Sequence, residues 1–567
     1  MGIGPFASPI SDDQLNDIKS LIETVLTTFT VQYSKAYAVA LVKHIEEELK
    51  KEKPDEWKLL ERPVQKDSNT RPLKTGYLVK QGAIRKNWLR RFFVVRPDYK
   101  VDYYETKETY DAGGKPKGTV AACGYGVSTN VAKDLLARAQ DVAAKLGMEA
   151  GDISPVKSYP EFCWEVHHIR RRCWFIHATS KNEKEEWTRM FKLCCRRCDG
   201  YNNKDPVHIA AFQLATRKTR HELGHYRYWV YGGTEEQVLG DLIVDDLECT
   251  LLKDIYSKIK GPRDVRIAIR SKVLQVIDSL VMAAVTPAYK AMEAAVKVIR
   301  GRIEEVIRSK IEPLFKAKQE IKEKIQSAIL ETINPTLAEK VSPRLAGIIE
   351  ILISPMTEAF QETRVVFDDQ MTLLARTVKE KNGFGESLTS YFHDLDCTPR
   401  TSAMYDAFKK VKVMKDPLWA LHQFFNDITP SPLIHEAKET LSKILDMAIY
   451  TFEKLLEEEV TAQPSILSDG VAAEGAVQQL KDSVQQKFGA DADTATVAYY
   501  RNTVMKIVMP FLLKVVTPLT KPVLEPINDL IPEPFKEVID IQDEFESVLE
   551  GIVGGSIDTV IEHVTAS

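Results

Sequence analysis

The sequence predicts a multi-domain α+β protein, in which a predominantly α-helical body accompanies one small β-rich module. Residues 75–96 and 159–179 are rich in Tyr, Phe, Trp, Val and Ile in short runs, which is typical of β-strands. Beyond Pro206, apolar residues recur at helical spacing with charges on the other face, as between Val296 and Ile311. The chain has 567 residues, 44% of them hydrophobic, so we expect two or three domains with separate cores.

The N-terminal segment, residues 1–71, is expected to be helical and to pack on the C-terminal body. Ser11 and Gln14 have the spacing of a capping box, and apolar residues at helical spacing follow them. A second helical run ends in a charged stretch closed by Pro54. The first residues lack the basic and apolar regions of a secretory signal, which predicts a cytoplasmic protein with reduced cysteines.

The β-rich module is assigned to residues 72–199 and an elongated helical bundle to residues 204–567. Within the module, residues 131–148 are alanine-rich and amphipathic, which predicts an inserted helix. In the helical part, Pro287, Pro313, Pro335 and Pro355 stand at unequal intervals. Because proline disfavours continuing a helix, we expect separate packed helices of three to six turns between them, rather than a regular repeat.

Charge and hydropathy restrict the partners of the chain. Lys and Arg total 77 against 81 Asp and Glu, and the net charge of −4 gives no overall field for nucleic acid. The most apolar candidate for a membrane span, residues 273–289, is interrupted by Asp278 and Pro287, so no membrane-spanning helix is predicted. Because the net charge is close to zero, any binding site for an anion must be a local cluster of Lys and Arg.

A predicted β-hairpin, residues 76–95, carries such a local site. Its basic residues are Lys80, Arg85, Lys86, Arg90 and Arg91. Cations that converge from two strands suit a polyphosphorylated headgroup, because charge-assisted hydrogen bonds to phosphate are strong. The same charges also fit a solvated strand edge that discourages sheet pairing. The run Arg170-Arg171-Arg172 either enlarges the cationic patch or forms a surface turn.

The hairpin resembles the opening of pleckstrin-homology (PH) domains. In that fold a lysine precedes a tryptophan by eight positions and an arginine follows it by three, as Lys80, Trp88 and Arg91 do here. The helix expected from residue 181 carries Trp187, which resembles the tryptophan that caps the barrel. The resemblance implies a PH β-barrel capped by a C-terminal helix. The phosphoinositide-binding residues predicted from it and from the basic loop are Lys80, Arg85, Lys86, Arg90, Arg91, Tyr103 and Lys117.

A second resemblance extends over almost the whole chain. Residues 32–41, 86–110, 360–367, 448–456 and 510–514 are similar to segments of the Niban family, in the family's order. The resemblance implies a non-catalytic, membrane-associated cytoplasmic protein of stress, survival and adhesion signalling, although the family's long C-terminal tail does not follow here. The predicted function is a signalling adaptor recruited to phosphoinositide-containing membranes. The alternative is a protein–protein scaffold whose helical body mediates assembly without specific lipid recognition.

A remote alternative is a zinc metalloprotease. His221, Glu222 and His225 form an H-E-x-x-H motif, which on a helix places two imidazoles on one face for zinc. No third-ligand motif follows, and Gly224 weakens a helix at this point. The C-x-x-C at Cys195 lacks a second such pair. We therefore predict no catalytic residues, no metal site and no cofactor.

Overall fold

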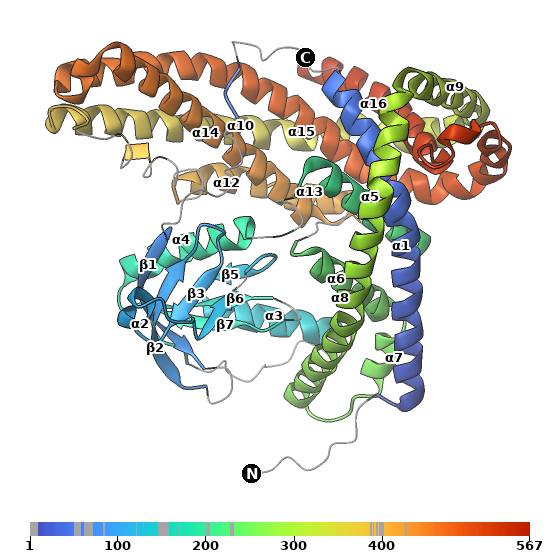
Figure 1. Ribbon diagram of the computed structural model, residues 1–567, viewed down its shortest axis with the longest axis horizontal. Coiled ribbons are helices and arrows are strands. Elements are labelled where there is room, and N and C mark those ends of the chain that lie inside the picture. Colours follow the sequence, from blue (N-terminus) through green and yellow to red (C-terminus); the bar gives the residue numbers. More distant parts are fainter. Residues whose placement is uncertain are drawn as a thin grey trace. The chain divides into compact units, whose positions relative to one another are not determined.

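The chain is predominantly helical and contains one seven-stranded antiparallel sheet, which confirms the predicted fold class (Figure 1). The computed structural model describes residues 10–49, 58–61, 72–82, 86–120, 122–145, 158–168, 171–198, 200, 204–226, 232–385, 388, 391–392, 395, 402–425 and 428–566. The chain forms two compact units. Unit 1 comprises residues 1–45, 66–225 and 231–309, and unit 2 comprises residues 46–65, 226–230 and 310–567.

The sheet of unit 1 has the order β4-β3-β2-β1-β7-β6-β5. The strands are β1 (Lys74–Gln81), β2 (Trp88–Val95), β3 (Val101–Tyr104), β4 (Gly118–Val120), β5 (Gly126–Ser128), β6 (Cys163–His167) and β7 (Trp174–His177). In the register of β1 with β2, Leu78 lies opposite Arg91 and Lys80 opposite Leu89. Since side chains alternate along a strand, Lys80 and Arg91 share the face of the core residue Leu78.

A helix closes one side of this sheet, as the PH resemblance implied. Helix α4 (Lys181–Arg197) begins at the N-cap Ser180, and its Trp187 and Phe191 are buried against the sheet. The ring centroids of Trp187 and Phe93 lie 6.2 Å apart. The predicted inserted helix is present as α3 (Val131–Lys145), and a short helix, α2 (Lys107–Asp111), follows β3.

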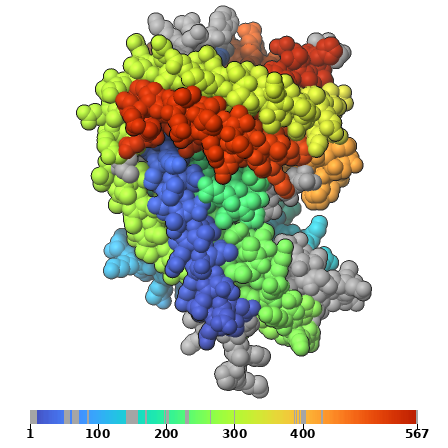
Figure 2. All heavy atoms as spheres, turned by 90° about the vertical axis from the view of Figure 1, so that its right-hand side faces the viewer, coloured from blue at the N-terminus to red at the C-terminus, as the bar shows by residue number. Residues whose placement is uncertain are grey.

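Five further helices belong wholly or mainly to unit 1. They are α1 (Asp12–Leu49), α5 (Pro206–Glu222), α6 (Glu235–Cys249), α7 (Leu252–Ser257) and α8 (Arg263–Ser309). Figure 2 shows α1 in blue along the surface, with green helices of the same unit beside it. Phe29 and Tyr33 of α1 pack on Phe212 of α5, and Tyr33 also meets Tyr289 of α8. These contacts join α1 to α5 and α8. Our domain boundaries at residues 71 and 204 remain a prediction.

In its described part, unit 2 consists of helices of six to 59 residues. They are α9 (Ile311–Thr336), α10 (Ser342–Glu380), α12 (Tyr405–Lys412), α13 (Lys415–Ala420), α14 (Pro430–Ala462), α15 (Gly470–Asn528) and α16 (Ile541–Ala566). A π-helical turn, η2 (Leu337–Val341), joins α9 to α10, and short 3₁₀ turns are η4 (Ser402–Met404), η5 (Leu421–Gln423), η6 (Pro464–Leu467) and η7 (Glu533–Phe535). The core of the unit includes the buried rings of Phe367, Phe452 and Phe488.

The prediction that prolines separate the helices holds for Pro313, which lies in the first turn of α9 after α8 ends at Ser309, and is wrong for the other three. Pro287, Pro335 and Pro355 lie inside α8, α9 and α10, which continue through them. A proline inside a helix costs about 3 kcal/mol or more. The neighbours of Pro355 in α10, Leu352 and Met356, are both fully buried, and tertiary packing of such a stripe offsets this cost.

One helix in the described part of the chain is long and apolar enough to cross a membrane, by length and composition alone. It is α15, in which one window has a mean hydropathy of 1.5, whereas the sequence predicted no membrane-spanning helix and placed the most apolar candidate at residues 273–289. Of that window, 44% is buried. Buried α15 side chains such as Val504 and Leu512 belong to the bundle with α10 and α14, and a core helix of a soluble bundle has the same composition.

Candidate anion-binding site

The core-facing side of the β1–β2 hairpin ends in a group of cations. The Lys80 residue is only 5% exposed, and its ammonium lies 4.5 Å from the centroid of the Tyr103 ring. Tyr103 shares this face because it lies opposite Phe93 in the pairing of β2 with β3. Burial lowers the pKa of Lys80, and the positive charges of Arg172 and Arg91 lower it further. Three positive charges therefore influence one another at this end of the sheet, and the Arg91 guanidinium donates a 2.8 Å hydrogen bond to the Arg90 carbonyl oxygen.

The charge of Lys80 is not neutralised by any side chain that the structure describes. Its ammonium donates only a long hydrogen bond, 3.5 Å, to the carbonyl oxygen of Gln81. No described carboxylate forms an ion pair with it. A buried charge without an opposite charge is unfavourable, so an anion bound between these cations would remove an existing repulsion as well as form new bonds.

Arg172 joins this group from the turn between β6 and β7. Its guanidinium lies 5.6 Å from the centroid of the Trp174 ring, and its side chain is exposed. The preceding residue, Arg171, donates hydrogen bonds to the Gln237 carbonyl at 3.1 Å and to Asp241 Oδ1 at 3.0 Å, both on α6. Arg171 thus anchors the turn that presents Arg172. The role of this arginine run could not be decided from the sequence, because only the fold brings β7 beside β1.

The other predicted residues lie elsewhere. Lys117 is exposed and forms a 3.0 Å ion pair with Glu105, whose pKa is lowered by Lys117 and also by Arg91. Lys86 is exposed in the β1–β2 loop with a left-handed backbone, φ 56°. Arg85 lies outside the described residues.

Arg90 does not join the site. Its guanidinium lies 4.1 Å from the centroid of the Tyr77 ring. Arg90 pairs with Val79 across the strands, which places it on the opposite face from Lys80. Trp88, the tryptophan of the PH-like spacing, lies on this same outer face, and its ring centroid is 5.0 Å from that of His177. The structure therefore brings together Lys80, Arg91 and Tyr103 and adds Arg172.

Gly118 of β4 makes room for the Tyr103 ring. A Cβ atom at this position would lie 2.3 Å from the Tyr103 hydroxyl oxygen, which is impossible without a shift. Any larger residue at position 118 must displace the ring that supports the Lys80 ammonium. Gly118 therefore acts on the site through the position of the Tyr103 ring. Nothing in the sequence around Gly118 predicts this role.

The H-E-x-x-H motif does not form a zinc-binding helix. Helix α5 ends at Glu222, and Gly224 adopts a left-handed backbone with φ 82°. His225 then turns to Asp246, with Nε2 2.7 Å from Oδ1, while Glu222 accepts a hydrogen bond from Gln32. Burial and the cations around it, Arg217 first, lower the pKa of His221 to about 3. Among the residues described, no group of three His, Cys, Asp or Glu side chains could hold a metal ion.

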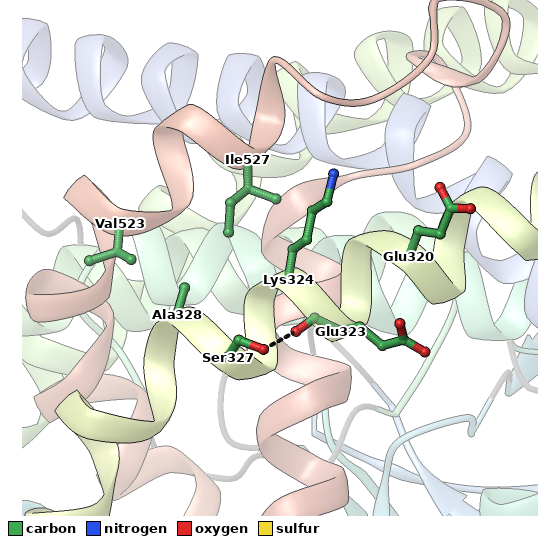
Figure 3. Close-up of a pocket in the computed structure, with 7 residues that line it drawn as sticks. All are labelled: Glu320, Glu323, Lys324, Ser327, Ala328, Val523 and Ile527. Carbon is green, nitrogen blue, oxygen red and sulfur yellow. Dashed lines mark hydrogen bonds between the residues drawn. The ribbon is translucent and has the colours of Figure 1, made fainter.

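Unit 2 contains an open groove of about 620 Å³ between α9 and α15 (Figure 3). Its lining residues are Glu320, Glu323, Lys324, Ser327, Ala328, Val523 and Ile527. The Ser327 hydroxyl donates a 2.9 Å hydrogen bond to the Glu323 carbonyl oxygen, so this hydroxyl proton is already used. The two acids and one lysine of the groove do not converge on a common point (Figure 3).

The capped antiparallel sheet with a cationic end defines a PH-domain protein with a large helical part. Residues 77–200 match the family described as Protein Niban 2-like, PH domain, and residues 335–510 match the Protein Niban 2-like domain. A PH domain-containing protein of Dictyostelium discoideum is 32% identical over 97% of this chain and 99% of its own length. The chain belongs to the Niban family, as the sequence resemblance indicated.

Other relatives agree with this assignment. Protein Niban 2 of Mus musculus is 25% identical over 89% of this chain, and Protein Niban 1 of Rattus norvegicus is 22% identical over 89%. The chain spans 66% and 54% of the lengths of these two relatives. The crystal structure of human FAM129B/MINERVA/NIBAN2 has the same fold, with a TM-score of 0.81, 23% identity and 98% of both chains covered. None of these relatives is named as an enzyme.

Proposed function

We propose that this chain is a non-enzymatic signalling adaptor that membrane phosphoinositides recruit through Lys80, Arg91, Arg172 and Tyr103. In this proposal the protein is cytoplasmic and associates peripherally with membranes. The observation that carries it is the buried ammonium of Lys80, held beside two arginines and without a described carboxylate partner. Membership of the Niban family and the match of residues 77–200 to its PH domain support the same function.

The three cations and the tyrosine offer complementary chemistry for a phosphorylated inositol. Arginine binds a phosphate through two parallel hydrogen bonds, whereas lysine acts as a point charge. Lys80 comes from β1, Arg91 from β2 and Arg172 from the β6–β7 turn, so a headgroup would be held from three sides. Hydrogen bonds to charged groups are worth about 1.5–3 kcal/mol each, and losing two would abolish recruitment at low lipid content.

The test is co-sedimentation of the full chain with vesicles that contain or lack phosphoinositides. We expect the wild type to bind only the phosphoinositide vesicles, and Lys80→Ala/Arg91→Ala to lose that binding. Arg90→Ala is the matched control, because Arg90 is a cation of the same strand on the opposite face. Equal binding of the wild type and the double variant would contradict the proposal. Binding that ignores the headgroup would favour the scaffold function instead.

A further inference from the structure

Residues 404–425 of unit 2 form a nearly continuous helical path through α12, α13 and η5. Its inner face is one apolar stripe at alternating spacings of three and four residues. The stripe consists of Met404, Ala407, Val411, Met414, Leu418, Leu421 and Phe425, all buried. Helix α12 packs against α10 and α14, so this face is already covered within unit 2.

The outer side of the same segment is unusually apolar for a surface. Tyr405 is 61% exposed, Val413 65%, Trp419 59% and Phe424 42%. Isolated exposed apolar residues are common on proteins, but four large ones within one segment indicate an interaction surface. Trp and Tyr are also the residues enriched where proteins meet the headgroup region of a bilayer.

Lysines accompany these apolar residues. Lys409, Lys412 and Lys415 are exposed, and none forms an ion pair with a residue that the structure describes. The ammonium of Lys412 lies 6.0 Å from the centroid of the Tyr405 ring. Lys410 differs, because it pairs with Glu358 at 2.8 Å.

The segment is cationic overall. Residues 405–424 contain four lysines and two aspartates, which leaves a charge of +2 with His422 neutral. Both aspartates, Asp406 and Asp416, are exposed. The guanidinium of Arg344, from α10, lies 4.6 Å from the centroid of the Phe424 ring and adds a further cation beside the segment.

We propose that the exposed side of residues 405–424, here called the aromatic–lysine face, docks on an anionic phospholipid bilayer. Trp419 and Tyr405 would lie at the headgroup level, and Lys409, Lys412 and Lys415 would contact lipid phosphates and carboxylates. Long lysine stems lie along apolar surface while their ammonium groups reach the charged layer, which fits the alternation of lysine and aromatic residues here. This contact requires no phosphoinositide and goes beyond the function proposed for the Lys80 site.

The choice of a bilayer as the partner follows from charge and size. The face is positive and its apolar residues are spread along one short segment. A specific protein partner needs about 800 Å² of complementary surface on each side, whereas a bilayer gains affinity from a few side chains. Each lysine near an anionic membrane contributes independently, so a weak contact of this kind adds to a second membrane site in the same chain.

The test uses the full chain carrying Lys80→Ala/Arg91→Ala, so that the PH site contributes nothing. Vesicles of phosphatidylcholine, with or without phosphatidylserine and without phosphoinositide, are the probe. We expect binding to the phosphatidylserine vesicles only, and loss of at least about tenfold in partitioning with Lys409→Gln/Lys412→Gln/Lys415→Gln. The matched control, Lys316→Gln/Lys340→Gln/Lys521→Gln, removes three exposed lysines of the same unit and should bind as before.

Trp419 supplies an independent readout. With bromine-labelled phosphatidylserine we expect quenching of the tryptophan fluorescence, which Trp419→Phe removes while far-UV circular dichroism stays unchanged. Leu519→Ala, at a residue 54% exposed on α15, is the apolar control and should retain quenching. The proposal is overturned if phosphatidylserine vesicles do not bind, if both lysine variants lose binding alike, or if quenching persists in Trp419→Phe. Dependence on an added protein rather than on lipid would also overturn it.

Discussion

The two faces of the β1–β2 hairpin carry similar residues in different surroundings. On the core side, burial beside Tyr103 lowers the pKa of the Lys80 ammonium, and the charges of Arg172 and Arg91 lower it further. On the outer side, Arg90 lies over Tyr77, exposed to solvent. Adjacent positions in a strand point to opposite faces, so neighbours such as Arg90 and Arg91 cannot serve one site. A cluster of cations in sequence is therefore not a cluster in space.

Replacing one cation on each face tests this difference most strongly. Lys80→Met should lower phosphoinositide affinity at least about tenfold, since one hydrogen bond to a charged group is worth about 1.5–3 kcal/mol. Arg90→Met should change it by no more than about twofold, as expected for an exposed charge. Affinity is measured on the same vesicles for both variants. Equal losses of affinity would show that both faces contact lipid and would contradict a binding site on the core side alone.

The same pair also separates the faces by stability. Lys80 is a buried cation beside other cations, so Lys80→Met removes a repulsion and should raise the free energy of unfolding. Arg90→Met removes a contact with an exposed ring and should leave that free energy within about 0.5 kcal/mol. Urea denaturation followed by tryptophan fluorescence measures both. A destabilised Lys80→Met variant would mean that the ammonium is satisfied in the free protein.

Gly118→Ala tests whether the Tyr103 ring helps to hold Lys80 in place. The added methyl group would lie 2.3 Å from the Tyr103 hydroxyl oxygen, so the ring must move. We expect a loss of affinity of about threefold to tenfold, together with about 1–3 kcal/mol of destabilisation from overpacking. In a Tyr103→Val background the whole ring is absent, so Gly118→Ala should cost less there. Equal costs in both backgrounds would contradict this role.

The sequence predicted most of this fold because its signals are local. The spacing of Lys80, Trp88 and Arg91, with Trp187 in a capping helix, was enough to predict the PH barrel, and the Niban resemblance predicted the helical parts. Roles that depend on tertiary contacts stayed open between alternatives. Arg172 joins the site only because β7 pairs with β1, and Arg171 holds that turn through α6. No periodicity in the sequence marks either arginine for its role.

One prediction from local rules failed, and one motif lacks the structure that its spacing suggests, for a related reason. Helices α8, α9 and α10 continue through prolines because their buried faces outweigh the missing hydrogen bond. The H-E-x-x-H spacing has chemical meaning only on an unbroken helix, and α5 ends inside the motif, at Glu222. In both cases the residues are present at the expected spacing, but tertiary packing and the ends of the helices determine their structural role.

The pH dependence of binding distinguishes the two faces with a smaller effect. Burial, Arg172 and Arg91 lower the pKa of Lys80 from 10.5, so Lys80 loses its proton at a lower pH than an ordinary lysine. Affinity for the headgroup should therefore fall as the pH rises through this lowered value, and Lys80→Arg should remove the fall. The pKa is lower in the folded state, so unfolding takes up a proton between the two values and stability rises with pH there. Calorimetric titration at several alkaline pH values measures the affinity.

The smallest expected effect comes from Glu105, an acid whose pKa the charge of Arg91 lowers. Glu105 pairs with Lys117 and is close enough to Arg91 for that charge to lower its pKa, so it competes with a bound phosphate. Glu105→Gln should raise phosphoinositide affinity by about twofold to threefold, and less at high salt, because the pair is exposed and screened. Glu108→Gln removes an exposed acid of α2 whose pKa is lowered mainly by Thr106 and should leave affinity unchanged. If both variants gain the same affinity, then net charge controls recruitment and the position of Glu105 does not. That result would contradict a binding site on the core side of the hairpin.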